Sequence, residues 1–331
     1  MRDSVCSTVS ERAMGKQLSM VEALMDPRLG ANAKLARIDD LIDWGRLEPH
    51  AARIRGSEAG RPPYPPMSML KALYLQALYD LSDPGLEEAL LDRLSFRRFC
   101  GFGADQPTPD ETTICRFRAA AAAAGALAAC FAEVNRQLDA KGLILRKGTL
   151  MDATIVAAKH VAPGKAAGMG AAHPKEPGAD WTNKNGKSFF GYKLHVGVDE
   201  GSGLIRRVAF TPARTLDGEM AEALISGDEA AVYADRAYES KARRGRLKAA
   251  GSKDRIMHRR HRYLPELPHW QAVRNRLIAR RRAPVEAVFS ALKRLYGKAR
   301  ARCASLLVNQ VDYLAFATVF NLRRAAHRLA P

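Results

Sequence analysis

The apolar positions of the first 60 residues recur at the three- and four-residue spacing of an amphipathic helix. Leu35, Ile38 and Ile42 show this spacing, which places apolar side chains on one helix face. A proline-rich stretch follows, and the next apolar run predicts a helix over residues 68–79, because proline is tolerated at the start of a helix. The chain is therefore predicted to open with helices.

Turn and cap signals divide the next part of the chain. The tripeptide Asp-Pro-Gly at residues 83–85 predicts a break, and the apolar spacing after it predicts a helix over residues 86–94. Asp110 or Thr108 is predicted to be the N-cap of a helix that runs through the alanine-rich segment 119–132. We expect this whole first part to be helical.

The period of the pattern changes from helix to strand after Lys141. Residues 147–157 alternate apolar and polar side chains as a strand does, and residues 191–200 and 204–214 do the same on either side of a Gly-Ser-Gly turn. Between the first two strands, residues 157–190 are rich in Gly, Pro, Ala and Lys. This composition predicts a mobile basic loop close to any functional site that the strands carry.

Short helices and strands alternate in the rest of the chain. They are a helix over residues 217–225, a strand that ends near Asp235, a basic helix over 240–251, a strand over 254–260 and a helix over 280–294. Three strands followed by this alternation indicate an α/β fold with a mixed sheet, preceded by an all-helical region.

The composition of the 331 residues is that of a soluble globular protein, with 47% apolar and 27% charged residues. The longest uncharged run, residues 119–132, is shorter than the roughly 20 apolar residues of a membrane span. No export signal opens the chain, so we expect a protein of the reducing cytoplasm. The cysteines are odd in number and never spaced as a CxxC pair, which argues against disulfides and zinc; they are Cys6, Cys100, Cys115, Cys130 and Cys303.

Positive charge is concentrated in one segment. The chain has 53 Lys and Arg against 35 Asp and Glu, a net charge of +18, and residues 241–302 hold 20 basic and 3 acidic residues, which is +17 of that total. Apolar residues at helical spacing interrupt the segment, so it belongs to folded helices rather than to a disordered tail. A folded surface with this charge implies a polyanionic partner, and nucleic acid before a membrane.

Three acids stand at informative positions: Asp152 within the first predicted strand, Asp235 at the end of the fourth, and Glu286 on the late basic helix. A carboxylate in a central strand is costly unless a cation, usually a metal, neutralises it. Each acid also has an ordinary interpretation. Asp152 could face solvent, Asp235 could be a turn residue, and Glu286 could pair with Arg282 one helical turn earlier.

Taken together, the element order and the three acids resemble the RNase H-like fold of retroviral integrases, in which two aspartates on neighbouring central strands and a glutamate on a later helix meet around Mg²⁺. Over nearly the whole chain, the motifs are similar to those of transposases of the IS5 family of bacterial insertion sequences, within the wider IS4-like DDE group. After an N-terminal region at residues 61–102, these motifs are "GTLMDATIV", "GYKLHVGVD", "YADRAYES", "RAPVEAVFSALKR" and "FNLRR".

By matching position, the resemblance implies that Asp152, Asp235 and Glu286 are the catalytic and metal-binding triad, with Mg²⁺ or Mn²⁺, as two ions, for the cofactor. The family's signature of an arginine, three residues, the glutamate, six residues and a lysine is satisfied by Arg282, Glu286 and Lys293. These three lie along one side of a helix, where the two cations would hold DNA phosphates at the metal. A tyrosine that often precedes the arginine is absent, which puts only the DNA contact of that tyrosine in doubt.

The activity implied by the resemblance is that of a DNA transposase, which cleaves at terminal inverted repeats and joins the 3′-OH ends to target DNA by metal-dependent phosphoryl transfer. The implied partner is double-stranded DNA, bound by a homodimer without a membrane, in the bacterial cytoplasm at the nucleoid. His195 is expected to be structural or near the site, and a packed aromatic side chain is the alternative for Tyr238. The residues expected to contact DNA are Arg282, Lys293, Arg236, Tyr238, Lys193 and Arg294.

The patterns and the resemblance together imply three regions. Residues 1–140 form a helical domain for end recognition, dimerisation or both, residues 141–302 form the DDE catalytic core, and residues 303–331 form a helix that packs on the core. One alternative function is a magnesium-dependent DNA nuclease of the same fold that never joins strands. A second is a domesticated, non-catalytic DNA-binding protein, which the intact acids and Lys293 disfavour.

Overall fold

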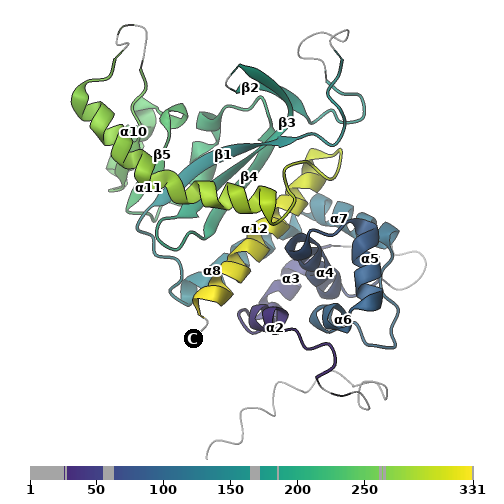
Figure 1. The fold of residues 1–331 in the computed structure, drawn as a ribbon. Coiled ribbons are helices and arrows are strands. Elements are labelled where there is room, and N and C mark those ends of the chain that lie inside the picture. Colours follow the sequence, from purple (N-terminus) through teal and green to yellow (C-terminus); the bar gives the residue numbers. More distant parts are fainter. Residues whose placement is uncertain are drawn as a thin grey trace, which may run out of the picture.

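A computed structural model represents the protein, and it describes residues 26, 28–54, 63–164, 172–184, 186–260, 263 and 266–329. In it a group of helices lies beside a mixed β-sheet, with one long helix across the sheet and a second between the sheet and the helices (Figure 1). The helical pattern predicted before residue 26, and Cys6, lie outside the described residues. Within the described part, no single helix has the length and apolarity to cross a membrane.

The described N-terminal region is helical throughout, which confirms the prediction from its apolar spacing. Helix α4 (Pro66–Tyr79) corresponds to the helix predicted over residues 68–79. Helix α7 (Glu111–Ala124) begins after the predicted N-cap Asp110, whose Oδ1 accepts a hydrogen bond from the backbone N–H of Thr113 at 2.6 Å. The other elements are α2 (Ala33–Asp39), η2 (Trp44–Leu47), α3 (Glu48–Ala51), α5 (Asp83–Asp92), α6 (Leu94–Cys100) and α8 (Ala126–Ala140).

The predicted break between two helices is present, but it lies at residues 80–82, because residues 83–85 form the first turn of α5. The Oγ of Ser82 accepts a hydrogen bond from the backbone N–H of Gly85 at 3.0 Å and caps the helix. Pro84 stands in that first turn, where the backbone N–H has no intrahelical partner to lose. Another helix end lies at Gly125, whose φ of 59° is left-handed, so the helix predicted through the alanine-rich segment is divided there into α7 and α8.

The predicted mixed sheet is present, with parallel and antiparallel strands. Its order is β2-β3-β1-β5-β6, and β4 also pairs with β3. Strand β3 is antiparallel to β1, β2 and β4, whereas β5 is parallel to β1 and to β6. The strands are β1 (Thr149–Ala157), β2 (Asp180–Lys184), β3 (Lys187–Asp199), β4 (Ile205–Pro212), β5 (Ala231–Ala234) and β6 (Lys253–Ile256).

The loop predicted over residues 157–190 is partly wrong. Strand β2 and the start of β3 form a hairpin there, and the rings of Trp181 and Phe190 lie 5.3 Å apart across it. The polar sequence of β2 carries no alternation that identifies a strand. Residues 165–171 and 185 of the predicted loop lie outside the described residues.

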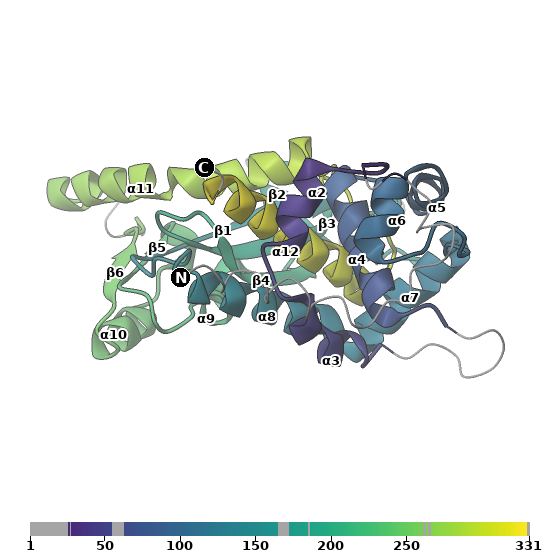
Figure 2. The same ribbon diagram turned by 90° about the horizontal axis from the view of Figure 1, so that it is seen from below.

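Helices cover both faces of the sheet (Figure 2). Helix α11 (His269–Arg294) crosses β1 and β5 on one face, where Val285 and Val288 join the core cluster that contains Leu150. It begins eleven residues before the predicted start at residue 280. On the other face, a second cluster contains Met151 and residues of α9 (Ala221–Leu224) and α10 (Lys241–Ala249). Two 3₁₀ turns, η4 (Asp217–Met220) and η5 (Arg236–Tyr238), complete this face.

Helix α12 (Leu306–Arg328) packs against β4 and also against α4, α7 and α8. At this junction the buried Asn321 accepts a hydrogen bond from the backbone N–H of Ile205 at 2.8 Å and donates to Asn135 of α8 at 2.9 Å. One hydrophobic cluster therefore runs from the N-terminal helices through α12 to the sheet. The division of the chain at residue 140 stays a prediction, and this core is continuous across it.

A buried charge network ties the same parts together. Arg118 of α7 is fully buried and donates to Asp83 of α5 at 3.0 Å, while its Nε lies 3.3 Å from a carboxylate oxygen of Asp312 on α12. Arg302, in the loop before α12, lies 3.5 Å from the other oxygen of Asp312. Because a buried charge is costly without partners, this network holds α12 against the N-terminal helices.

Candidate active site

Strand pairing brings two of the three predicted acids to the same level of the sheet. Parallel pairing sets Leu150 of β1 opposite Tyr233 of β5. Asp152 and Asp235 each lie two residues further on, so both belong to the face of that pair. Asp235 follows the last residue of β5 and keeps an extended backbone, with φ −76° and ψ 179°. Neighbouring strands are about 4.8 Å apart, and the two carboxyl groups are therefore close.

One oxygen of each carboxylate is held by the backbone. The Oδ1 of Asp152 accepts a hydrogen bond from the N–H of Ala153 at 2.9 Å. The Oδ1 of Asp235 caps η5 by accepting from the N–H of Ala237, also at 2.9 Å. These bonds fix the two carboxyl groups and leave the second oxygen of each for another partner.

Arg282 of α11 occupies that second oxygen of Asp152. The distance from its Nη2 to Oδ2 is 2.8 Å, and the two side chains are only 12% and 19% exposed. The Nε of Arg282 is buried and has no hydrogen-bond partner among the described residues. Arg282 thus pairs with the strand aspartate rather than with Glu286 of its own helix.

Glu286 lies one helical turn beyond Arg282, at the spacing that places both on neighbouring parts of the helix surface. It is exposed and makes no ion pair or hydrogen bond with any residue that the structure describes. Within the described ranges, no three His, Cys, Asp or Glu side chains are arranged to hold one metal ion. The structure therefore brings Asp152 and Asp235 together, and the ligand role of Glu286 stays a prediction.

The electrostatics of Asp152 favour a cation. Burial raises the pKa of Asp152 above its usual value, the guanidinium of Arg282 lowers it in part, and the charge of Asp235 raises it further. Two carboxylates in a partly buried site need positive charge to stay ionised together. Hard oxygen donors of this kind fit Mg²⁺ or Mn²⁺.

Asp217, at the start of η4, is a charged neighbour of the site that the sequence reasoning missed. It forms an ion pair with Lys193 of β3, whose Nζ lies 2.9 Å from its Oδ1. The Lys193 ammonium also donates a hydrogen bond to the backbone carbonyl of Thr215 at 2.9 Å. The pair of Lys193 and Asp217 lines one pocket of about 540 Å³ together with Asp235 and Arg236. Asp217 is the first residue of the helix predicted over residues 217–225. Acidic residues are common in the first turn of a helix, so the sequence alone did not indicate a role for it at the site.

The prediction that Tyr238 contacts DNA is contradicted by its burial. Its side chain is fully buried against the cluster that contains Met151, which is the packed-aromatic alternative. Burial and the nearby charges of Asp217, Asp152 and Asp235 raise its pKa. The Tyr238 hydroxyl has no hydrogen-bond partner within the described part of the chain.

His195 of β3 is also fully buried, as expected for a structural residue. Its Nε2 lies 3.0 Å from the Oγ1 of Thr211 on β4. Burial lowers the pKa of His195 to about 4. At neutral pH it is therefore an uncharged imidazole inside the sheet.

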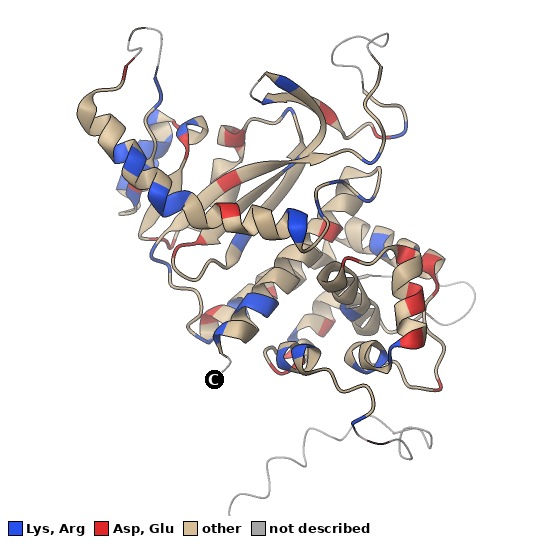
Figure 3. Cartoon of the chain, in the orientation of Figure 1, with Lys and Arg blue, Asp and Glu red and all other residues tan. Residues whose placement is uncertain are grey.

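Three of the residues predicted to contact DNA, Arg236, Lys293 and Arg294, are exposed, whereas the side chains of Arg282 and Lys193 are each only 12% exposed. Arg236 directly follows Asp235, and Lys293 and Arg294 end α11. Burial and the charge of Lys184, on the β2 hairpin, lower the pKa of Lys293, so the hairpin extends the basic surface of the helix. Figure 3 shows Lys and Arg gathered along α10 and α11, whereas α5 carries Asp and Glu.

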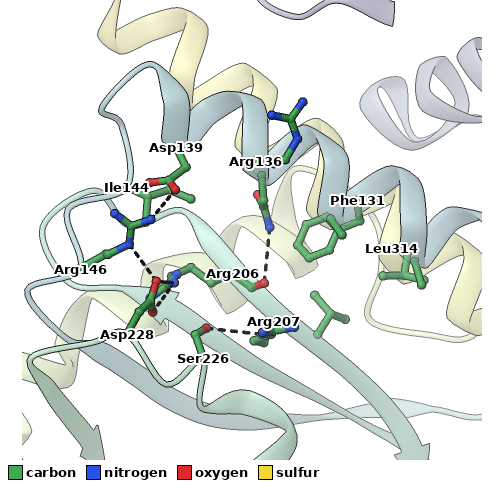
Figure 4. Close-up of a pocket in the computed structure, with 14 residues that line it drawn as sticks. Phe131, Arg136, Asp139, Ile144, Arg146, Arg206, Arg207, Ser226, Asp228 and Leu314 are labelled. Atoms are coloured by element: carbon green, nitrogen blue, oxygen red, sulfur yellow. Dashed lines mark hydrogen bonds and ion pairs between the residues drawn. The ribbon is translucent and has the colours of Figure 1, made fainter. Parts of the chain in front are cut away.

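A second pocket, of about 330 Å³, lies between α8 and β4 (Figure 4). Four of its charged groups pair with one another. Arg146 lies between Asp139 and Asp228, 2.8 Å from the latter, and Arg206 pairs with Asp228 at 2.6 Å. Neither Asp152 nor Asp235 lines this pocket.

Two family models match the chain. Residues 24–120 match the model described as "Transposase domain (DUF772)", and residues 145–322 match the model described as "Transposase DDE domain". The second match covers more than half of the 331 residues and includes both strand aspartates, Arg282 and Glu286. No solved structure matches the chain.

Proposed function

Because the chain belongs to the family of DDE transposases, which cleave DNA and transfer its strands, we propose that it is the transposase of a bacterial insertion sequence of the IS5 family. In this proposal it cleaves at terminal inverted repeats and joins the freed 3′-OH ends to target DNA. The observation that carries the proposal is that Asp152 and Asp235 stand at one level of two neighbouring strands, with α11 and its Arg282 against them. The order β4-β3-β1-β5-β6, antiparallel at β3 and parallel beyond β1, supports an RNase H-like core.

Asp152 and Asp235 would hold the divalent cation, and Glu286 would add a third carboxylate from α11. Bound Mg²⁺ or Mn²⁺, as two ions in this proposal, supplies Lewis acidity at the scissile phosphate. The chain contributes rigidity, since both aspartates are fixed by backbone hydrogen bonds at their Oδ1 atoms. His195 takes no proton at neutral pH, because burial lowers its pKa to about 4.

The cations around the acids would bind the DNA backbone. Arg236 lies beside Asp235, and Lys293 and Arg294 lie at the end of α11, so phosphates on both sides of the scissile bond have a partner. Lys193 already pairs with Asp217 and would reach a phosphate only by exchanging that partner. We propose further that the N-terminal helices recognise the element ends and that the protein acts as a homodimer on DNA.

Neutral variants of the three acids test the catalytic assignment. Asp152→Asn, Asp235→Asn and Glu286→Gln should each abolish cleavage of a plasmid that carries the gene with its flanking DNA, measured with Mg²⁺ and with Mn²⁺. Each should keep its affinity for that DNA, because removing a negative charge near phosphate does not weaken binding. Asp180→Asn on β2 is the matched control, since this strand acid pairs with the exposed Arg214 away from the site.

Cleavage by Asp152→Asn at the rate of the unmodified protein would refute the assignment. Loss of cleavage by Asp180→Asn would show that the effect is not specific to the site. A joining assay with tagged donor DNA separates a transposase from a nuclease of the same fold, because only the transposase links the tagged 3′ end to the target.

A further inference from the structure

The guanidinium of Arg282 already neutralises the carboxylate of Asp152, which a metal ion at this aspartate would also have to bind. The Nη2 of Arg282 lies 2.8 Å from Oδ2, and Oδ1 is bound to the N–H of Ala153. Both oxygens of the carboxylate therefore have a donor. Each oxygen keeps a second lone pair, but a divalent cation there is repelled by the guanidinium that already lies beside the carboxylate.

The pair is also incomplete on the arginine side. The Nε of Arg282 is buried without a hydrogen-bond partner, and Asp152 is the single ion-pair partner of Arg282 among the described residues. A guanidinium can bind two oxygens of a carboxylate or phosphate side by side. Here one such position is unused, so a DNA phosphate can offer Arg282 a more complete set of bonds than Asp152 does.

The helix that carries Arg282 has a weak point at the same place. Pro284 lies inside α11, two residues after Arg282, and it has no N–H to donate to the carbonyl of Arg280. Buried Ile278 holds the part of the helix before this point, and buried Val285 holds the part after it. A helix bends most easily where such a bond is missing, so the weakest point of α11 lies at the turn that carries Arg282.

We propose that Arg282 is an electrostatic latch that couples metal binding to DNA binding. Without DNA, its guanidinium neutralises Asp152 and keeps the divalent cation out. A DNA phosphate draws the guanidinium away, and Asp152 then becomes available together with Asp235. The inference rests on the proposed function, because it needs a metal at Asp152 and a phosphate at Arg282. By thermodynamic reciprocity, the metal must strengthen DNA binding by the factor by which DNA strengthens metal binding.

Binding of Mn²⁺ to the full chain, followed by electron paramagnetic resonance of the free ion, tests the latch without any cleavage. In the absence of DNA, Arg282→Gln should bind Mn²⁺ roughly tenfold more tightly than the unmodified protein or better, since an arginine beside an aspartate shifts the proton affinity of that aspartate by one to three pKa units. Arg281→Gln is the matched control. It removes the same charge from the neighbouring position, where the side chain is 71% exposed and lies 3.6 Å from Glu200.

Three outcomes separate the latch from the proposed function. Tighter Mn²⁺ binding in Arg282→Gln, unchanged binding in Arg281→Gln and loss of the gain in Asp152→Asn/Arg282→Gln support the latch. Equal binding with and without Arg282, still dependent on Asp152, overturns the latch and leaves the metal site in place. No binding that depends on Asp152 in any variant, with or without DNA, overturns both.

A second measurement needs no substitution and covers the case in which Arg282→Gln fails to fold. A short random-sequence duplex should raise the Mn²⁺ affinity of the unmodified protein, and Mn²⁺ should raise its affinity for the duplex by the same factor. Arg282→Lys keeps the charge but loses the planar fork, so its coupling should be smaller. Independence of the two affinities in the unmodified protein would overturn the latch.

Discussion

The buried imidazole of His195 makes the stability of the protein depend on pH in a specific interval. The side chain is fully buried on β3, with Nε2 3.0 Å from the hydroxyl of Thr211, while its Nδ1 is buried with no hydrogen-bond partner among the described residues. Burial lowers the pKa from its ordinary value of 6.5 to about 4, with Asp217 opposing this and Lys193 adding to it. The folded protein therefore takes up this proton at a lower pH than the unfolded chain does.

The sign and the size of the effect follow from linkage. Between pH 6.5 and about 4, the unfolded chain binds the proton and the folded chain does not, so stability falls as the pH is lowered through that interval. Each pKa unit is worth about 1.36 kcal/mol, and the interval corresponds to at most about 3 kcal/mol. Above the ordinary pKa, His195 contributes no pH dependence.

Urea unfolding at neutral pH and at about pH 4.5 measures this difference. His195→Gln, which cannot be protonated, should lose less stability than the unmodified protein on acidification, by about 2 to 3 kcal/mol. Comparing the two pH values within each protein removes the packing cost of the substitution. The exposed His269 supplies the control, and His269→Gln should lose as much as the unmodified protein. An identical loss in His195→Gln would show that His195 titrates normally, and a role in proton transfer would then have to be reconsidered.

Two further predictions concern the basic surface and the buried charge network. Binding to DNA should weaken with salt, and replacing both Arg282 and Lys293 by alanine should flatten the log-log slope by about one for each lost phosphate contact; an unchanged slope would remove both from the interface. Arg118→Leu should cost about 3 to 5 kcal/mol in urea unfolding, because Asp83 and Asp312 keep their charges without the buried partner. A cost below about 1 kcal/mol would mean that these carboxylates find other partners or protonate.

Periodicity identified the long helices and the central strands because their buried faces repeat every 3.6 or 2 residues. Where the local sequence was compatible with more than one structure, periodicity did not identify the correct element or its start. Pro84 is compatible with a loop and with the first turn of a helix, and only the cap formed by Ser82 decides between them. Strand β2 is mostly polar and does not alternate apolar and polar residues, so the sequence pattern could not predict its pairing with β3.

For the site, the positions of Asp152 and Asp235 followed from a resemblance, and the strand register then placed them together. The partner of Arg282 could not be predicted in this way. Helical spacing offered Glu286 four residues away, whereas the structure pairs Arg282 with an aspartate 130 residues earlier in the chain. Burial of Tyr238 was likewise set by how the sheet is covered, which a single sequence does not reveal.

The position of α12 between the sheet and the N-terminal helices bears on how the protein is made. Translation proceeds from the N-terminus, and a region with its own core can fold before synthesis ends. Here α4, α7 and α8 lack a cover for part of their apolar surface until residues 306–328 have left the ribosome. That surface is exposed to aggregation until then, and a product truncated before α12 lacks the packing that α12 gives to both the N-terminal helices and the sheet.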